Sequence, residues 1–364
     1  MKIDTYHSTD TDFHKERLRW TDILHKTPGM LPRRYVFVLT NLCNLRCSFC
    51  FQEKERIEGS MTTEDWLRVV EQLPSYAAVT LTGGEPFMFE GFEEVFTAVV
   101  SRYPCNIISN GLLLTEDVIE LLLAYDNFRV MSVSLDDIGN VVRGVKPKQW
   151  KKAEDMIRFF AELRNELQSN TLLDVKTVVL DQNVQSLLDV HRYCMETLRC
   201  DTHSFQFLKG SPMQHADFMF PMEDMFKTWE ASLYEEWEVI CRQMELIRQY
   251  NLKHNKTCYS HPKLFDLNSE TPIQIHHAAF ANVKLFTKEH YYPCKAPWES
   301  VHINVDGNLF PCMAIKMGNV KNQSLKDIIT GEMFSRFKEI ICTEGIVGGC
   351  NRCGYLRPKE HLLV

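Results

Sequence analysis

The sequence predicts an α/β fold in which parallel strands alternate with helices. Six short runs rich in β-branched and aromatic residues are separated by segments whose apolar residues recur at helical spacing. No long structureless gap separates them, so right-handed crossovers can join neighbouring parallel strands. Six such repeats are too few for a closed eight-stranded barrel. On this pattern alone, a partial, open barrel and a doubly wound sheet both fit.

The expected strands follow one another between residues 35 and 208. They occupy residues 35–40, 78–82, 105–109, 129–135, 172–180 and 203–208. The segment TTEDWLRVVEQL shows the pattern of the helices expected between them, with a threonine at its start and acidic residues in its first turn. In either fold, functional residues belong in the loops that follow the carboxyl ends of the strands.

The chain divides into four expected parts. Residues 1–34 form an N-terminal extension, 35–209 the strand–helix repeats, 210–292 a connector of unassigned fold, and 293–364 a small cysteine-bearing region. Within the last part, Asp306-Gly307 separates two alternating runs and predicts a β-hairpin.

Charge and hydropathy exclude several classes of partner. The net charge of −7 disfavours nucleic acid and anionic membrane surfaces. The first residues lack the apolar core of a secretory signal, and no apolar run is long enough to span a membrane. We therefore expect a cytoplasmic protein, in which the thirteen cysteines serve as metal ligands, catalytic thiols or packing residues rather than in disulfides.

Three cysteines lie within eight residues directly after the first expected strand. Cys43, Cys47 and Cys50 in CNLRCSFC form a C-x3-C-x2-C pattern, and thiolates prefer soft metals. A structural zinc site needs four closed ligands, so spacing alone leaves zinc with a distant fourth ligand as an alternative. The motif GGEP, residues 83–86, follows the second strand and would lie on the same rim.

Together these two motifs resemble the radical S-adenosylmethionine (SAM) superfamily over residues 35 to about 208. The resemblance implies a partial (β/α)6 barrel in which Cys43, Cys47 and Cys50 hold a 4Fe–4S cluster. The fourth iron would bind S-adenosyl-L-methionine, whose reductive cleavage gives a 5′-deoxyadenosyl radical that abstracts hydrogen from a substrate. An electron donor such as flavodoxin or ferredoxin is implied as a partner.

Further positions for contacts to S-adenosylmethionine lie on the same rim. Glycines permit close approach of backbone to a ligand, a glutamate can accept from an ammonium group, and proline stiffens a turn. Ordinary turn formation is the alternative for each loop, and a solvated surface arginine is the alternative for the VVRG motif. By resemblance, the cofactor-binding residues are Gly83, Gly84, Glu85, Pro86, Ser109, Asn110, Ser134 and Arg143.

A second cysteine group occupies the C-terminal region. Cys294, Cys312, Cys350 and Cys353, with the hairpin between the first two, resemble the auxiliary-cluster region called SPASM, or its shorter relative, twitch. Four cysteines suffice for one fully ligated 4Fe–4S cluster, so we expect two clusters in total. A closed zinc site with four thiolates also fits the spacing.

Three functions are compatible with these motifs. The first is a radical enzyme that dehydrogenates or rearranges a small, sugar-like molecule; the second is a maturase that crosslinks, epimerises or oxidises a peptide; the third is a non-catalytic zinc protein. The sequence does not rank the acid–base residues, for which Asp136, Asp137, Glu299 and Asp306 are candidates. Roles for Cys258 as a hydrogen donor and Cys342 as a ligand also stay open, as do the substrate, the redox outcome and the oligomeric state.

Overall fold

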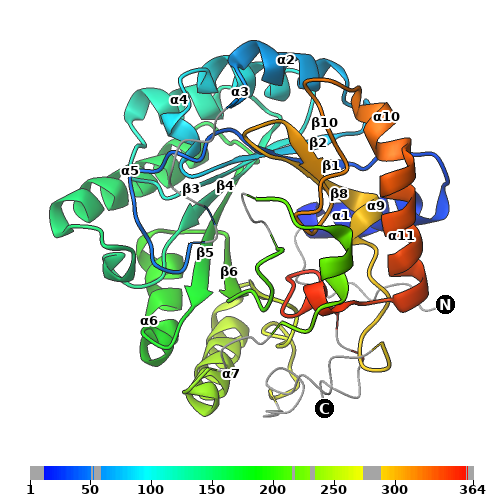
Figure 1. The fold of residues 1–364 in the computed structure, drawn as a ribbon. Helices are drawn as coiled ribbons and strands as arrows, with labels where there is room; N and C mark the ends of the chain where they lie inside the picture. The colour runs from blue at the N-terminus through cyan, green and yellow to red at the C-terminus, as the bar shows by residue number, and fades with distance from the viewer. Residues whose placement is uncertain are drawn as a thin grey trace.

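The computed structural model describes residues 12–50, 52, 59–214, 218–229, 234–273, 288–357 and 359. Its strands form one curved sheet in the order β10-β9-β8-β1-β2-β3-β4-β5-β6-β7. Figure 1 shows this sheet as an open arc with helices on its outer side. The expectation of an α/β fold built on a partial, open barrel is confirmed.

All six expected strands are present, and each pairs in parallel with its neighbour along the chain. Their bounds are β1 Arg34–Val38, β2 Ala78–Thr82, β3 Cys105–Ser109, β4 Phe128–Ser134, β5 Leu172–Val179 and β6 Thr202–Phe207. Because the strands are parallel, their carboxyl ends meet at one rim, where the sequence places the motifs.

A helix lies between each pair of neighbouring strands in the strand–helix repeats, and the first of these helices begins after the threonine that its sequence predicts. They are α2 Thr63–Glu71, α3 Phe92–Val100, α4 Glu116–Leu123, α5 Pro147–Glu166 and α6 Leu187–Arg192, with the short turns η1 Pro86–Met88, η2 Val141–Arg143, η3 Val184–Ser186 and the π-helical η4 Tyr193–Thr197. Thr62 caps α2 by accepting from the Asp65 amide at 3.2 Å. Trp66 of α2 is fully buried and stacks on Phe37 of β1, with ring centroids 4.8 Å apart.

The sheet extends beyond the six expected strands at both edges. The connector contributes η5 Met222–Phe226, α7 Trp237–His254 and then β7 Cys258–His261, which pairs in parallel with β6. The expected hairpin exists as β8 Ser300–Ile303 and β9 Asn308–Phe310, followed by β10 Gly318–Asn319. Because β8 also pairs in parallel with β1, the C-terminal region continues the barrel sheet.

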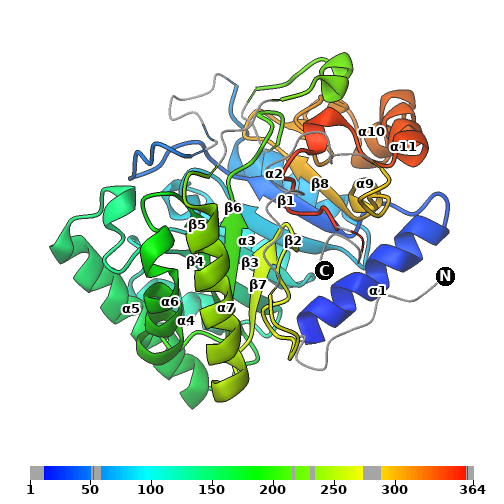
Figure 2. The same cartoon turned by 90° about the horizontal axis from the view of Figure 1, so that it is seen from below.

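The remaining helices flank this C-terminal edge. They are α1 Asp12–Lys26, α9 Ala296–Glu299, α10 Leu325–Thr330 and α11 Glu332–Glu344, with the turn η7 Gly348–Cys350. Trp20 of α1 stacks on Tyr76, which precedes β2, at 5.2 Å between ring centroids. Lys295, the residue before α9, donates to Asp22 of α1 at 2.5 Å. Helix α1 therefore contacts both the segment that precedes β2 and the start of α9 (Figure 2).

Side-chain direction alternates along each strand and defines the two faces of the sheet. His203 of β6 contacts His191 of α6 and therefore points outward toward the helices. Ser204 and Gln206, which alternate with His203 along β6, consequently point toward the inner face of the sheet. No helix among the described residues has the length and apolar character needed to cross a membrane.

Candidate active site

The cysteine loop leaves β1 while its backbone is still paired with the GGEP loop. The Leu39 amide donates to Thr82 at 2.9 Å, the Gly84 amide to Thr40 at 2.7 Å, and the Glu85 amide to the Leu42 carbonyl at 2.8 Å. These hydrogen bonds extend the β1–β2 pairing past the ends of both strands. They fix the chain one residue before Cys43, so the position of the cysteine loop depends directly on GGEP.

The two glycines of GGEP are required by this close backbone approach. A Cβ atom at Gly83 would lie 2.4 Å from the Thr40 carbonyl oxygen, and one at Gly84 would lie 2.3 Å from that of Leu42. Either contact would separate the two loops. The described contact is between two protein backbones, and the close approach of this loop to a ligand stays a prediction.

Glu85 links the second loop to the third. Its carboxylate is fully buried and accepts hydrogen bonds from the Ser109 hydroxyl at 2.8 Å, the Asn110 amide at 2.8 Å and the Phe87 amide at 3.4 Å. Burial raises the pKa of Glu85 to about 7, although these hydrogen bonds oppose the rise. Pro86 then begins η1 at its first position, where a missing amide proton is harmless. Contact between this loop and a cofactor stays a prediction.

Asn110 brings the third loop against the cysteines. Its Nδ2 atom donates to Asn44 Oδ1 at 2.7 Å and lies 3.9 Å from the Cys43 sulfur. Its Oδ1 atom accepts from the Leu112 amide at 2.9 Å, which fixes the side chain. Ser109 and Asn110 therefore lie beside the cysteine loop, as the rim placement predicted.

The three cysteines of this loop differ in exposure. Cys47 is buried, Cys43 is partly buried and Cys50 is exposed. Burial raises the pKa of Cys43, and the nearby carboxylate of Glu85 and the thiols of Cys50 and Cys47 add to the effect. Three thiols gathered at one rim fit a soft metal centre, whose positive charge would offset this cost.

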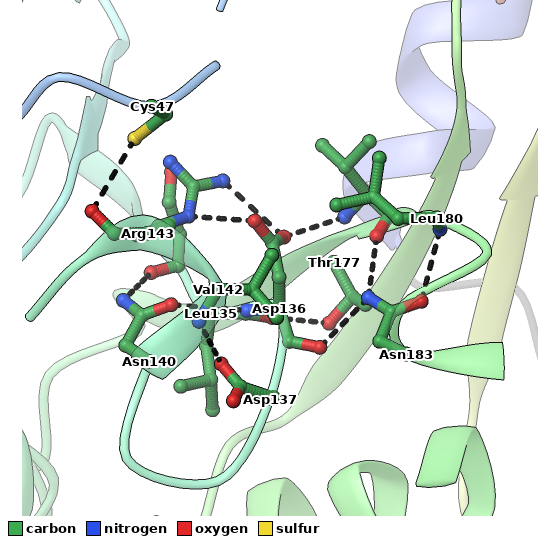
Figure 3. Close-up of polar contacts among 12 residues, drawn as sticks. Cys47, Leu135, Asp136, Asp137, Asn140, Val142, Arg143, Thr177, Leu180 and Asn183 are labelled. Carbon is green, nitrogen blue, oxygen red and sulfur yellow. Dashed lines mark hydrogen bonds and ion pairs between the residues drawn. The ribbon is translucent and has the colours of Figure 1, made fainter. Parts of the chain in front are cut away.

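Arg143 connects the fourth loop to the cysteine loop. Its guanidinium forms an ion pair with Asp136, with Nε 2.8 Å from Oδ2 (Figure 3). The guanidinium carbon lies 5.4 Å from the centroid of the Phe49 ring. The Arg143 carbonyl oxygen lies 4.0 Å from the Cys47 sulfur. Ser134 ends β4, and its carbonyl accepts from the Asn140 amide group at 3.0 Å. Arg143 is thus held in place rather than freely solvated.

The four C-terminal cysteines gather at a second site. Cys294 precedes α9, Cys312 follows β9, and Cys350 and Cys353 lie in the last described loop. Burial raises the pKa of Cys312, and its proximity to Cys294, Cys353 and Cys350 raises it further. Four converging thiols fit a fully ligated cluster.

No group of three or more His, Cys, Asp or Glu side chains among the described residues is arranged around a single metal ion. Cluster ligands stand further apart than the ligands of one ion because each thiolate binds a different iron. The donor sets at both cysteine groups suit clusters by their chemistry, since thiolates are the usual ligands of 4Fe–4S centres.

The structure separates the candidate bases by environment. Asp136 is engaged by Arg143, and Asp306 accepts from Asn308 within its own turn. Asp137 accepts from the Val142 amide at 3.1 Å, and Glu299 is buried near Cys294. None of the four is assigned as a base.

The two cysteines with open roles lie apart from the rim. Cys258 of β7 is fully buried against the outer helices, where its sulfur accepts from Asn251 at 3.0 Å. Burial raises the pKa of Cys258 to about 12. Cys342 is exposed on α11. Cys258 is therefore a packing residue on the helix side of the sheet and does not face the inner surface.

Sequence reasoning did not identify three residues at this rim. Asn140 and Asn183 hold the loop that carries Asp136, since the Asp136 amide donates to Asn140 and Asn183 donates to the Asp136 carbonyl. Lys209 lies two residues after the end of β6 and beside the loop of Cys353 and Gly354. The rim rule applied to the last expected strand could have identified Lys209, whereas the asparagines resemble ordinary turn residues.

An open parallel barrel with three thiols after its first strand defines a class of iron–sulfur enzymes. Two family models match the chain: the radical SAM superfamily over residues 37–193 and the iron–sulfur cluster-binding SPASM domain over residues 294–354. The chain belongs to the radical SAM superfamily and carries a C-terminal SPASM region. The two matched domains imply 4Fe–4S clusters and S-adenosylmethionine as cofactors, as the sequence predicted, and favour an enzyme over the non-catalytic zinc protein.

Similar proteins include a maturation protein and a cofactor-modifying protein. The sporulation killing factor maturation protein SkfB of Bacillus subtilis is 30% identical over 48% of this chain, which spans only 44% of the SkfB length. The tungsten-containing aldehyde ferredoxin oxidoreductase cofactor-modifying protein of Pyrococcus furiosus is 23% identical over 88% of this chain and 87% of its own length.

A solved structure shares the fold over most of the chain. Streptococcus suis SuiB bound to S-adenosylmethionine is similar with a TM-score of 0.61 at 17% identity, covering 92% of this chain and 75% of SuiB.

Proposed function

We propose that this chain modifies a peptide by radical chemistry. The main support is the likeness to SuiB in a structure bound to precursor peptide SuiA, which covers 97% of this chain with a TM-score of 0.61. The name of SkfB, a maturation protein for a killing factor, points in the same direction. The comparisons thus favour the peptide alternative over the small, sugar-like substrate that the sequence suggested first.

For this reaction we assign the N-terminal cysteines to the radical-forming cluster. Cys43, Cys47 and Cys50 would each bind one iron and leave the fourth iron for the amino and carboxylate groups of S-adenosylmethionine. When bound, the cluster and the nucleotide together supply a 5′-deoxyadenosyl radical that abstracts hydrogen from the substrate. The backbone pairing between GGEP and this loop would hold the cluster and the nucleotide in a fixed relation.

The cofactor would be positioned by the loops on this rim. We assign these contacts to Gly83, Gly84, Glu85, Pro86, Ser109, Asn110, Ser134 and Arg143. The described contacts support a different role for each of three of these residues. Glu85 accepts hydrogen bonds and orders the third loop, Asn110 reaches the cysteine loop, and Arg143 is aimed at that loop by its ion pair.

We assign the C-terminal cysteines to a second cluster, in which all four irons have protein ligands. A closed cluster of this kind suits electron transfer because no iron is left for another ligand. A flavodoxin or ferredoxin would supply the electron that starts the reaction. The division at residues 209 and 292 remains a functional proposal, since the strands of the barrel sheet come from both sides of it.

A second candidate function is modification of a small molecule. It is supported by the relative from Pyrococcus furiosus, which is named for modifying a cofactor and matches this chain nearly end to end. This alternative predicts that no peptide changes mass in the test below.

The test is co-expression of this chain with each short peptide encoded beside its gene, followed by anaerobic reconstitution and mass spectrometry. We expect one peptide to lose hydrogen, or to exchange it for solvent deuterium, only when S-adenosylmethionine and a reductant are present. The Cys47→Ala variant should abolish both the change and the release of 5′-deoxyadenosine. The Cys342→Ala variant is the matched control and should retain both. If no peptide changes while added small molecules stimulate 5′-deoxyadenosine release, the second candidate replaces the first.

A further inference from the structure

The segment that follows β6 is joined to the C-terminal cysteine loops. The Gly210 amide donates to the Asn351 carbonyl at 3.1 Å, and Gln214 Nε2 donates to the carbonyls of Gly349 and Asn351 at 2.9 and 2.7 Å. The Ala314 amide, two residues after Cys312, donates to Met213 at 2.7 Å. These hydrogen bonds fix the backbone after Phe207 against the loops that carry three of the four cysteines.

Close packing adds to this connection. A Cβ atom at Gly210 would lie 2.6 Å from the Asn351 side chain, so only glycine permits the contact. Asn351 is itself held by a hydrogen bond to the Trp229 carbonyl at 3.1 Å. The residue before Gly210 therefore has a well-defined position relative to the Cys350–Cys353 loop.

That residue is Lys209, and its ammonium group lies beside this loop. Its Nζ atom is 3.6 Å from the position that a Cβ atom on Gly354 would occupy. Lys209 forms no ion pair with a carboxylate among the residues that the structure describes. Burial lowers the pKa of Lys209, and the nearby Cys353 sulfur opposes this effect. Leaving a partly buried ammonium without a counter-charge is costly.

We propose that Lys209 supplies the positive counter-charge of the C-terminal cluster and raises its reduction potential. This inference rests on the assignment of Cys294, Cys312, Cys350 and Cys353 as the cluster ligands. Four thiolates around a 4Fe–4S core carry net negative charge, which increases when the cluster gains an electron. A fixed ammonium group stabilises the more negative state, and net charge and hydrogen bonds to the sulfurs are known determinants of cluster potential.

A carboxylate also lies near this site. Glu299 is buried near Cys294; the pKa of that thiol is raised to about 12, mainly by burial and further by the charges of Cys353 and Glu299. Burial lowers the pKa of His302 of β8, and the charges of Arg34 and Lys209 lower it further. The contacts described place the Lys209 charge near Cys353, where it acts as a positioning residue for charge rather than as a cluster ligand.

The test is a redox titration of the C-terminal cluster alone. In a Cys43→Ala, Cys47→Ala, Cys50→Ala background, the reduced cluster is followed by electron paramagnetic resonance at controlled potentials. Adding Lys209→Met should shift the midpoint to more negative potential, whereas Lys209→Arg, which keeps the charge, should stay close to the background value. Lys326→Met removes an exposed lysine of α10 and should leave the midpoint unchanged.

Iron and sulfide analysis distinguishes the outcomes. A background protein without any cluster would overturn the ligand assignment and this inference with it. A normal cluster with an unchanged midpoint in Lys209→Met would overturn only the role of Lys209. Loss of iron in Lys209→Met but not in Lys209→Arg would support the charge role, whereas loss in both would show that Lys209 acts through packing.

Discussion

At the scale of single residues, the ion pair between Asp136 and Arg143 is the contact that orders the rim. Asp136 is fully buried and also accepts from the Val178 amide at 2.7 Å, so it joins the fourth loop to β5. Burial raises the pKa of Asp136, and the Arg143 guanidinium opposes that rise. This pair, drawn in Figure 3, holds Arg143 so that its guanidinium lies over the ring of Phe49 in the cysteine loop.

We predict that Asp136→Asn destabilises the protein by roughly 3 kcal/mol. Removing one partner leaves the largely buried guanidinium of Arg143 uncompensated, which is the costly way to break a buried ion pair. Urea unfolding of the metal-free protein measures this free energy. Asp137→Asn is the matched control, because Asp137 is only half-buried and accepts hydrogen bonds from the backbone of Val142 and Val141, so its loss should cost only about 1 kcal/mol. Equal losses in the two variants would contradict this role for the ion pair.

At the scale of elements, buried histidines join helices α6 and α7 to the sheet. His191 of α6 contacts His203 of β6 at 3.0 Å between Nδ1 atoms and Asn251 of α7 at 2.8 Å. His203 in turn contacts Thr177 of β5 at 2.8 Å. Burial lowers the pKa of His191 to about 4 from its ordinary 6.5, and it also lowers that of His203.

This arrangement predicts loss of stability in mild acid. Between pH 6.5 and about 4, the unfolded chain protonates His191 while the folded chain does not, so stability rises with pH and falls on acidification. The contribution of His191 is roughly 3 kcal/mol over this window. The measurement is the free energy of unfolding of metal-free protein at several pH values.

His191→Gln should reduce the pH dependence, because the protonatable ring is removed. His254→Gln is the control, since His254 is exposed at the end of α7. A steep acid dependence that survives in His191→Gln would assign the effect to other groups.

At the scale of the whole molecule, the C-terminal region is part of the barrel rather than a separate attachment. Its strand β8 pairs with β1 along four residue positions, Arg34↔Ser300 through Phe37↔Ile303. Val301, Ile303, Phe334 and Phe337 belong to the same buried core as Tyr35 and Phe37. Figure 1 shows β8, β9 and β10 continuing the arc of the sheet beyond β1.

We therefore predict that a chain ending at residue 292 does not fold into a stable barrel. Truncation would expose the edge of β1 and the apolar residues that β8 and α11 cover, which favours aggregation. Size-exclusion chromatography and thermal unfolding of the metal-free proteins measure the effect. A monodisperse truncated chain that melts within a few degrees of the full-length chain would show instead that the C-terminal region is an independent domain.

The sequence by itself determined the repeating strands and helices, the rim on which the motifs lie, and the division of seven cysteines into two groups. These features depend on local periodicity and on short spacings, which a sequence displays directly. It missed the pairing of β7 with β6 and of β8 with β1, because short strands far apart along the chain carry no local signal of their partner.

The tertiary structure alone decided how the loops act on one another. In the structure, Gly83 and Gly84 allow two loop backbones to approach each other closely, and Glu85 holds the third loop by a hydrogen bond. Lys209 lies beside a cysteine loop that follows it by more than a hundred residues. These roles arise from side chains and loops that meet only when the curved sheet brings distant strand ends together.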